Sequence, residues 1–295
     1  MRFDNRRVST RGVDDLRGSP KAKGVAVGGG IGVIALIAVV VVNLLSGGGL
    51  DPALIESALG GGTQSGSAES AAELQERCST DEALTRYNDC YLIKVYNETD
   101  EVWSEEFGQR GLDYRPPRLA FFSGSVQTGC GPATAEVGPF YCPPDERIYF
   151  DLDFLLQLQQ EFGATGRYAQ AYILAHEFGH HLQTLLGIER QVRVAQQQNP
   201  RQANELSVAL ELQADCLAGV WGRLANDNGN VTITDAELAE AQDAAAAVGD
   251  DRIQMQTQGR VNPESWTHGS AAEREQWYLA GYNAGDLDAC DTFSE

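Results

Sequence analysis

Residues 172–186 read Tyr-Ile-Leu-Ala-His-Glu-Phe-Gly-His-His-Leu-Gln-Thr-Leu-Leu, an apolar run that contains a cluster of ionisable side chains. Their spacing predicts a helix on which His176 and His180 lie one turn apart on the same face, where both can bind one metal ion. Glu177 then lies beside that metal, placed to take a proton from a bound water. Burying these three side chains in an apolar helix is costly unless a partner satisfies them. The pattern therefore favours a metal site over two structural histidines.

A catalytic zinc site normally has three protein ligands, so the histidine pair needs a third. The chain has only four histidines. His181 points about 100° away from His180 around a helix. The third histidine of the metzincin pattern is absent because residue 186 is a leucine. We therefore expect a carboxylate from a later helix.

A second apolar helix is expected over residues 201–226, and it has two acidic side chains four residues apart, Glu211 and Asp215. This spacing lets Glu211 bind zinc while Asp215 accepts the free N–H of a zinc-bound histidine. Glu205 is the alternative ligand, but it lies six residues before Glu211 on a different face. The leucines and alanines around Glu211 and Asp215 leave little solvated face, which argues against two ordinary surface acids.

Together these residues predict peptide-bond hydrolysis with one zinc ion per chain. Zinc with three protein ligands lowers the pKa of its water to about 7. Glu177 is expected to accept that proton as a general base and to pass it later to the leaving amine. His268, next to a predicted helix start, is the candidate donor to the oxyanion, although a structural role fits its sequence context equally well.

The ligand pattern resembles that of gluzincins, and several short sequence motifs extend the likeness to one family. These motifs occur in the family's order over about 88–286, at 122–131, 138–143, 148–152, 168–172, 211–216, 249–254 and 267–270. They resemble the bacterial family called "putative neutral zinc metallopeptidase", whose members are single-pass membrane proteins. The resemblance implies a zinc peptidase fold of the gluzincin-like endopeptidase type, and it marks Asp250 and Asp251 without giving them a physical role.

The N-terminal part predicts a membrane anchor. Residues 24–50 carry no charge, and about 20 apolar residues span a bilayer. Seven basic residues against three acidic ones precede this run, which places 1–23 in the cytoplasm by the positive-inside rule. We therefore expect a cytoplasmic tail at 1–23, a transmembrane helix at 24–45, a Gly/Ser-rich linker at 46–72 and an extracytoplasmic domain at 73–295. A cleaved signal peptide is disfavoured, since no clear A-x-A site follows.

All six cysteines lie in the expected external part, where disulfides form. Six cysteines allow 15 pairings, and sequence alone does not choose among them. Nearest-neighbour spacing suggests Cys78–Cys90 and Cys130–Cys142, which leaves Cys216 with Cys290. The formal net charge of −20 argues against nucleic acid or anionic lipid as a ligand.

The expected fold is α+β and mainly helical, a zincin-like domain with a small β-sheet behind the transmembrane helix. Short strands are expected at 119–123 and 147–151. The helices are expected at 78–95, 153–162, 167–186, 201–226, 234–248 and 270–284. Capping boxes that begin at Thr234 and Ser270 support two of these starts.

A peptide or protein substrate is the expected partner, and two other functions compete with protein cleavage. One is a zinc-stabilised scaffold or chaperone-like envelope protein that binds partners without cutting them. It has no use for a general base at Glu177, which favours an enzyme. The other is hydrolysis of peptidoglycan stem peptides, which the sequence does not separate from cleavage of proteins.

Overall fold

The computed structural model describes residues 1–3, 7–17, 68–152, 154 and 166–294. In this part of the chain the fold is mostly helical, as expected. The helices are α3 (Ala71–Arg77), α4 (Asp81–Arg86), α5 (Asn88–Gln109), α7 (Arg167–Leu185), α8 (Ile188–Gln198), α9 (Ala203–Asp227), α10 (Asp235–Ala247), α11 (Asp250–Gln258) and α12 (Ala271–Ala284). The expected helix at 153–162 lies outside the described residues.

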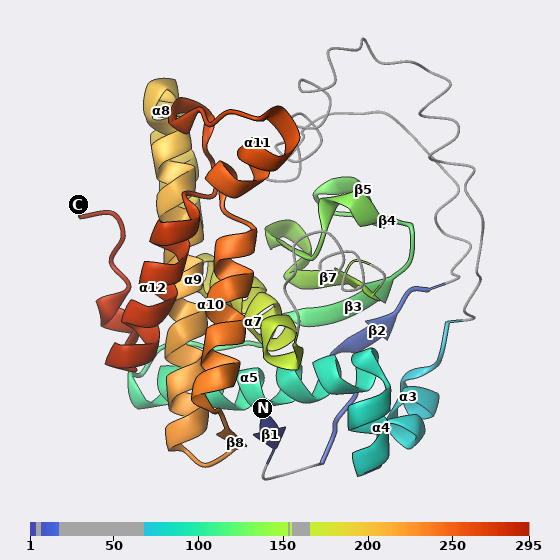
Figure 1. The fold of residues 1–295 in the computed structure, drawn as a ribbon. Coiled ribbons are helices and arrows are strands. Elements are labelled where there is room, and N and C mark those ends of the chain that lie inside the picture. Colours follow the sequence, from blue (N-terminus) through green and yellow to red (C-terminus); the bar gives the residue numbers. More distant parts are fainter. Residues whose placement is uncertain (4–6, 18–67, 153, 155–165, 295) are drawn as a thin grey trace, which may run out of the picture.

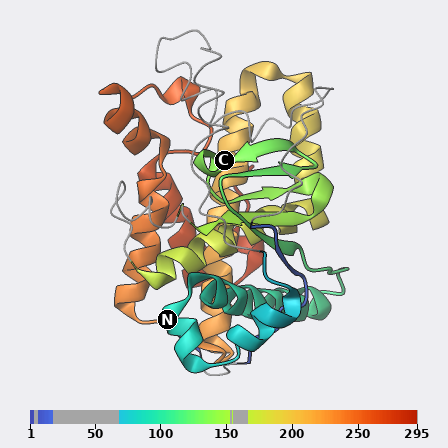
Figure 2. The ribbon, with the colours of Figure 1, turned by 90° about the vertical axis from the view of Figure 1, so that its right-hand side faces the viewer.

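The main sheet has four strands in the order β2-β3-β7-β6. The strands are β1 (Arg2–Phe3), β2 (Val13–Asp15), β3 (Arg118–Phe122), β4 (Ser125–Thr128), β5 (Gly131–Thr134), β6 (Phe140–Cys142), β7 (Arg147–Asp151) and β8 (Val231–Thr232). In the sheet β2, β3 and β7 are parallel, whereas β6 is antiparallel to β7. Figure 1 shows the sheet on one side of α7 and the α9–α12 pair on the other, and Figure 2 shows the sheet from the front. Helix α7 is therefore central, between the sheet and the α9–α12 pair.

Three expected disulfides are confirmed, at Cys78–Cys90, Cys130–Cys142 and Cys216–Cys290. The third closes the longest loop, with a sequence separation of 74 residues, and joins the C-terminal segment to α9. Constraining so long a loop removes much conformational entropy from the unfolded chain.

The expected membrane topology is wrong. No helix within the described ranges is both long and apolar enough to cross a bilayer, and the expected span at 24–45 lies outside those ranges. The residues before it belong to the same body as the rest of the chain, because β1 pairs with β8 and β2 pairs with β3. One sheet cannot lie on both sides of a membrane. This pairing contradicts a cytoplasmic tail at residues 1–17 opposite an external domain, and no described helix supports the expected single-pass assignment to the cell membrane.

Close helix packing around α9 depends on glycines. A Cβ on Gly179 of α7 would lie 2.9 Å from the Cα of Ala214, and one on Gly281 of α12 would meet the Cys216 carbonyl oxygen at 1.9 Å. Real Cβ atoms essentially never approach so closely. The glycine inside the histidine motif thus allows α7 and α9 to approach one another, which brings their polar side chains together.

Gly281→Ala should therefore destabilise the fold, because the backbone of α9 cannot yield as a flexible side chain would. We expect the free energy of unfolding in urea titrations to fall by ~1–3 kcal/mol, the usual range for overpacking. Gly108→Ala is the matched control on α5, where an added Cβ would meet nothing within 4 Å. It should raise stability by up to about 1 kcal/mol through helix propensity. Equal effects of the two changes would contradict this account of the packing.

Candidate metal centre

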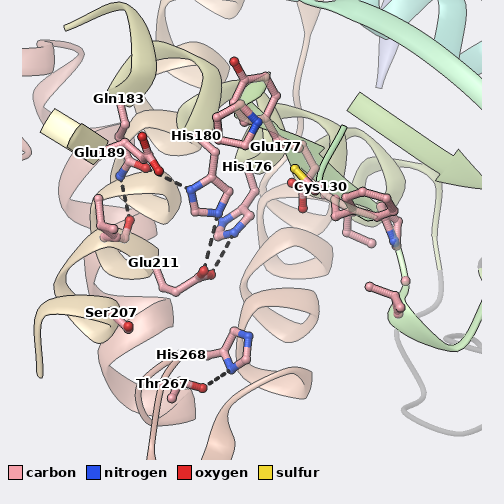
Figure 3. A pocket seen from close by; sticks show the side chains of 18 of the residues that line it. Cys130, His176, Glu177, His180, Gln183, Glu189, Ser207, Glu211, Thr267 and His268 are labelled. Atoms are coloured by element: carbon pink, nitrogen blue, oxygen red, sulfur yellow. Dashed lines mark hydrogen bonds and ion pairs between the residues drawn. The ribbon is translucent and has the colours of Figure 1, made fainter. Parts of the chain in front are cut away.

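Three side chains from two helices converge on one point. His176 and His180 come from α7, and Glu211 comes from α9. The Nε2 atom of His176 lies 3.2 Å from Glu211 Oε2, and that of His180 lies 3.5 Å from Glu211 Oε1. One ligand atom from each of the three lies within 4.8 Å of the others. Figure 3 shows the two rings and the carboxylate facing one another across a cavity. The structure thus brings the three expected ligands together.

The donor set fits zinc. Two imidazole nitrogens and one carboxylate oxygen form the usual protein part of a catalytic zinc site. Each histidine also has a hydrogen-bonding partner on its other nitrogen, as metal-bound histidines almost always do. Elsewhere in the described residues, Cys78, Asp89 and Cys90 lie near one another, but these two cysteines form a disulfide. They are therefore not free to bind a metal.

Asp215 lies beside His176, in the position that the sequence predicts. Its Oδ1 lies 2.8 Å from His176 Nδ1, and it is fully buried. Arg274 of α12 donates to both carboxylate oxygens, at 2.8 and 3.0 Å. The Tyr172 hydroxyl donates to Oδ1 at 2.5 Å. A buried carboxylate with three such donors stays ionised, so His176 carries its proton on Nδ1 and presents Nε2 to Glu211.

The candidate ligands shift one another's pKa values. Burial alone would lower the pKa of His176, but Asp215 and Glu211 raise it to about 10 in the metal-free protein. Burial would likewise raise the pKa of Glu211, yet His180 and His176 hold that pKa well below its ordinary value. A metal at this point therefore competes with protons on the histidines, so its binding releases protons.

Glu177 lies in the same cavity but outside the ligand group. Its side chain is buried, and this burial raises the pKa of its carboxyl group above the ordinary value. Phe140 and Tyr141 of the edge strand β6 line the cavity nearby, with the half-buried His268 on the side of Glu211. The position of Glu177 is that of a general base beside a metal.

Asp250 holds the loop that carries His268. Its Oδ2 accepts the backbone N–H groups of Thr267, His268 and Gly269, and its Oδ1 lies 3.2 Å from His268 Nδ1. Burial would lower the pKa of His268, but Asp250 raises it. Asp251 instead accepts the N–H of Ala271 at the start of α12. The two acids therefore have a physical role, which is to fix this loop and direct His268 towards the cavity.

The remaining candidates lie outside the site. His181 is bound between the Tyr141 hydroxyl, at 3.0 Å, and the Arg115 carbonyl, at 2.7 Å. Burial lowers its pKa to about 4, so it is a neutral structural histidine. Glu205 is exposed and does not belong to the ligand group.

Sequence reasoning missed three polar side chains of the site: Tyr172, Gln183 and Arg274. Tyr172 and Gln183 lie in the helix of the apolar histidine motif, where a buried polar group needs a partner, and this was the signal available. Arg274 stands between Glu273 and Glu275 in the sequence, so only the packing of α12 against α9 reveals that it is 3% exposed and needs a counter-charge.

The combination of a His-Glu-x-x-His helix with a glutamate from a later helix is the residue pattern typical of zinc-dependent peptidases. The chain belongs to the family described as "Putative neutral zinc metallopeptidase", whose sequence profile matches residues 1–293. It is 46% identical over 227 residues to an uncharacterized protein of Mycobacterium tuberculosis, covering 74% of this chain and 75% of that one. It is 47% identical over 199 residues to the uncharacterized protein YpfJ of Escherichia coli K12, covering 67% and 68%. No solved structure matches the chain.

Proposed function

We propose that this protein is a zinc-dependent peptidase that hydrolyses peptide bonds with Glu177 as the general base. The observation that carries the proposal is the convergence of His176, His180 and Glu211 beside a buried carboxylate that is not itself a ligand. A scaffold that only needed a structural metal would gain nothing from burying Glu177 there, because burial of a carboxylate is costly.

The residues around the ligands have separate tasks in this mechanism. Zinc, when bound by the three ligands, acidifies water and polarises a carbonyl group. Glu177 accepts a proton from the attacking water and returns it to the leaving amine. His268, held by Asp250, is placed to donate to the oxygen that becomes negative. Asp215 keeps His176 oriented throughout.

The sheet provides a place for the substrate backbone. Strand β6 is at the edge of the four-stranded sheet, and its residues Phe140 and Tyr141 line the cavity. An extended peptide that paired with this edge would run past Glu177. This arrangement suits a chain of amino acids better than a compact small molecule.

Metal removal tests the proposal. The purified protein should cleave members of a mixed peptide library, detected by mass spectrometry, and lose this activity when a chelator removes the metal. One equivalent of zinc per chain should restore it. A parallel incubation with cross-linked peptidoglycan stem peptides separates the two substrate classes. Zinc binding without cleavage of either substrate would reject the enzyme and favour the scaffold.

A further inference from the structure

A chain of hydrogen bonds connects His180 to the C-terminal segment through two glutamines. His180 Nδ1 lies 2.9 Å from Gln183 Oε1. Figure 3 labels both side chains at the cavity. Gln183 Nε2 donates to Gln213 Oε1 at 3.1 Å, and Gln213 Nε2 donates to the Cys290 carbonyl at 2.9 Å. Both glutamines are buried, one on α7 and one on α9. None of the proposed chemistry uses them.

Backbone carbonyls fix the direction of every bond in this chain. A carbonyl only accepts, so the Gln213 amide must turn its nitrogen to Cys290 and its oxygen to Gln183. The Leu210 carbonyl accepts from Gln183 Nε2 at 2.7 Å, which turns that amide in the same sense. Gln183 Oε1 therefore faces His180 as an acceptor. His180 must therefore carry a proton on Nδ1, which reserves Nε2, on the side of Glu211, for the metal.

The C-terminal segment is bonded to three residues of α9, which are Ala209, Gln213 and Cys216. Cys290 is covalently bonded to Cys216, three residues after Gln213 on the same helix. The Thr292 hydroxyl donates to the Ala209 carbonyl at 2.6 Å. The disulfide thus fixes the position of the Cys290 carbonyl, at the far end of the hydrogen-bond chain. On α9, Gln213 lies between Ala209 and Cys216, the two residues that anchor the segment.

We propose that Gln183 and Gln213 are positioning residues that set the tautomer and ring orientation of His180. The disulfide-bonded C-terminus is then part of the metal centre, through the Cys290 carbonyl. His176 is oriented by a carboxylate and His180 by this neutral chain, so both rings present Nε2 to one point. The inference rests on the zinc site of the proposed function, and it does not depend on peptide cleavage.

Zinc affinity tests the inference directly. Gln183→Leu and Gln213→Leu should each weaken zinc binding, measured by competition with a chelator, and the change at Gln183 should reach about 10–100-fold. Gln254→Leu is the matched control, since Gln254 is buried and hydrogen-bonded to Ser265 away from the ligands. It should leave the affinity unchanged. Failure of the wild-type protein to bind zinc would reject the proposed function, whereas equal affinity in wild type and Gln183→Leu would reject this inference alone.

Gln183→Glu separates positioning from a purely structural role. It keeps an acceptor for His180 but sets a carboxylate against the oxygens of Leu210 and Gln213. The metal-free variant should therefore melt at a lower temperature than Gln183→Leu, yet bind zinc more tightly than Gln183→Leu does. In the zinc-bound wild type, ¹⁵N NMR should show a protonated Nδ1 on His180. An affinity order that simply follows the melting temperatures would overturn the positioning role.

A double-mutant cycle tests whether the C-terminus contributes to the metal centre. The double change Cys216→Ala and Cys290→Ala should weaken zinc binding because it frees the Cys290 carbonyl. Adding Gln213→Leu should then cost little more, since residues in one hydrogen-bond network do not contribute additively. Fully additive losses would show that the disulfide and Gln213 act independently, and would remove the C-terminus from the metal centre.

Discussion

Glu177→Gln should reduce the catalytic efficiency of peptide hydrolysis by about 10²–10⁴-fold, the range that a general base contributes. Glutamine has nearly the shape of glutamate and keeps its hydrogen-bonding capacity, but it cannot accept the proton. Zinc should remain bound at one ion per chain, because Glu177 is not among the three side chains that form the ligand group. Steady-state kinetics on a cleaved peptide and metal analysis of the same sample measure both quantities.

Glu205→Gln is the matched control for this change. Glu205 is also a glutamate near the site in sequence, but it is exposed and lies outside the ligand group. Its substitution should leave both zinc content and hydrolysis unchanged. Full hydrolysis by Glu177→Gln would reject the general base. A variant that has lost hydrolysis but still performs its role in cells would favour the scaffold instead.

The main helices could be predicted because their signals are local. The apolar spacing around His176 predicts α7 within a residue of its observed ends, and α9 is predicted within two residues. The capping boxes at Thr234 and Ser270 are both present in the structure, where they begin α10 and α12. Such signals depend on neighbours in the sequence, so they survive without knowledge of the tertiary fold.

Polar helices and very short strands could not be predicted in this way. Helix α8 is mostly polar and starts after Gly187 without a side-chain cap, so neither an apolar run nor a capping residue marks it. Helices α4 and α5 are separated by Tyr87, whose backbone is extended. No proline or glycine stands next to it in the sequence to predict this break. Strands β1 and β2 have two and three residues, too few for an alternating pattern. Their partners β8 and β3 lie far away in the sequence, so no local pattern indicates that the N-terminal residues pair within the fold.

The same difference between local signals and contacts made by the tertiary fold applies to the candidate site. The histidine spacing and the Glu211–Asp215 spacing are properties of single helices, and both led to the expected positions. The Arg274 partner of Asp215 comes from α12. Gln183 is bonded in turn to Gln213 of α9, and Gln213 to the Cys290 carbonyl of the C-terminal segment, which the fold alone brings near. Arg274 and Gln213 were therefore invisible as site residues until the helices were packed together.

The two acids of α9 should differ sharply when each is changed. Glu211→Ala removes one of three ligands, so the site should be empty of zinc at protein concentrations where the wild type is full. Asp215→Asn keeps an acceptor near His176 and leaves all three ligands, so zinc affinity should fall only about 10–100-fold. Metal analysis after dialysis against a weak chelator distinguishes the two outcomes.

Asp215→Asn should also lower the stability of the metal-free protein, and by more than Glu211→Ala does. The guanidinium of Arg274 is buried and pairs with Asp215 at 2.8 Å, so the substitution leaves an uncompensated charge in the core. Breaking one partner of a buried pair commonly costs about 3–5 kcal/mol. The metal-free Asp215→Asn protein should thus unfold at lower urea than metal-free Glu211→Ala. Full zinc in Glu211→Ala, with loss of zinc in Glu205→Ala, would move the third ligand to Glu205. That outcome would contradict the geometry, since Glu205 is exposed and lies on a different face of α9 from Glu211.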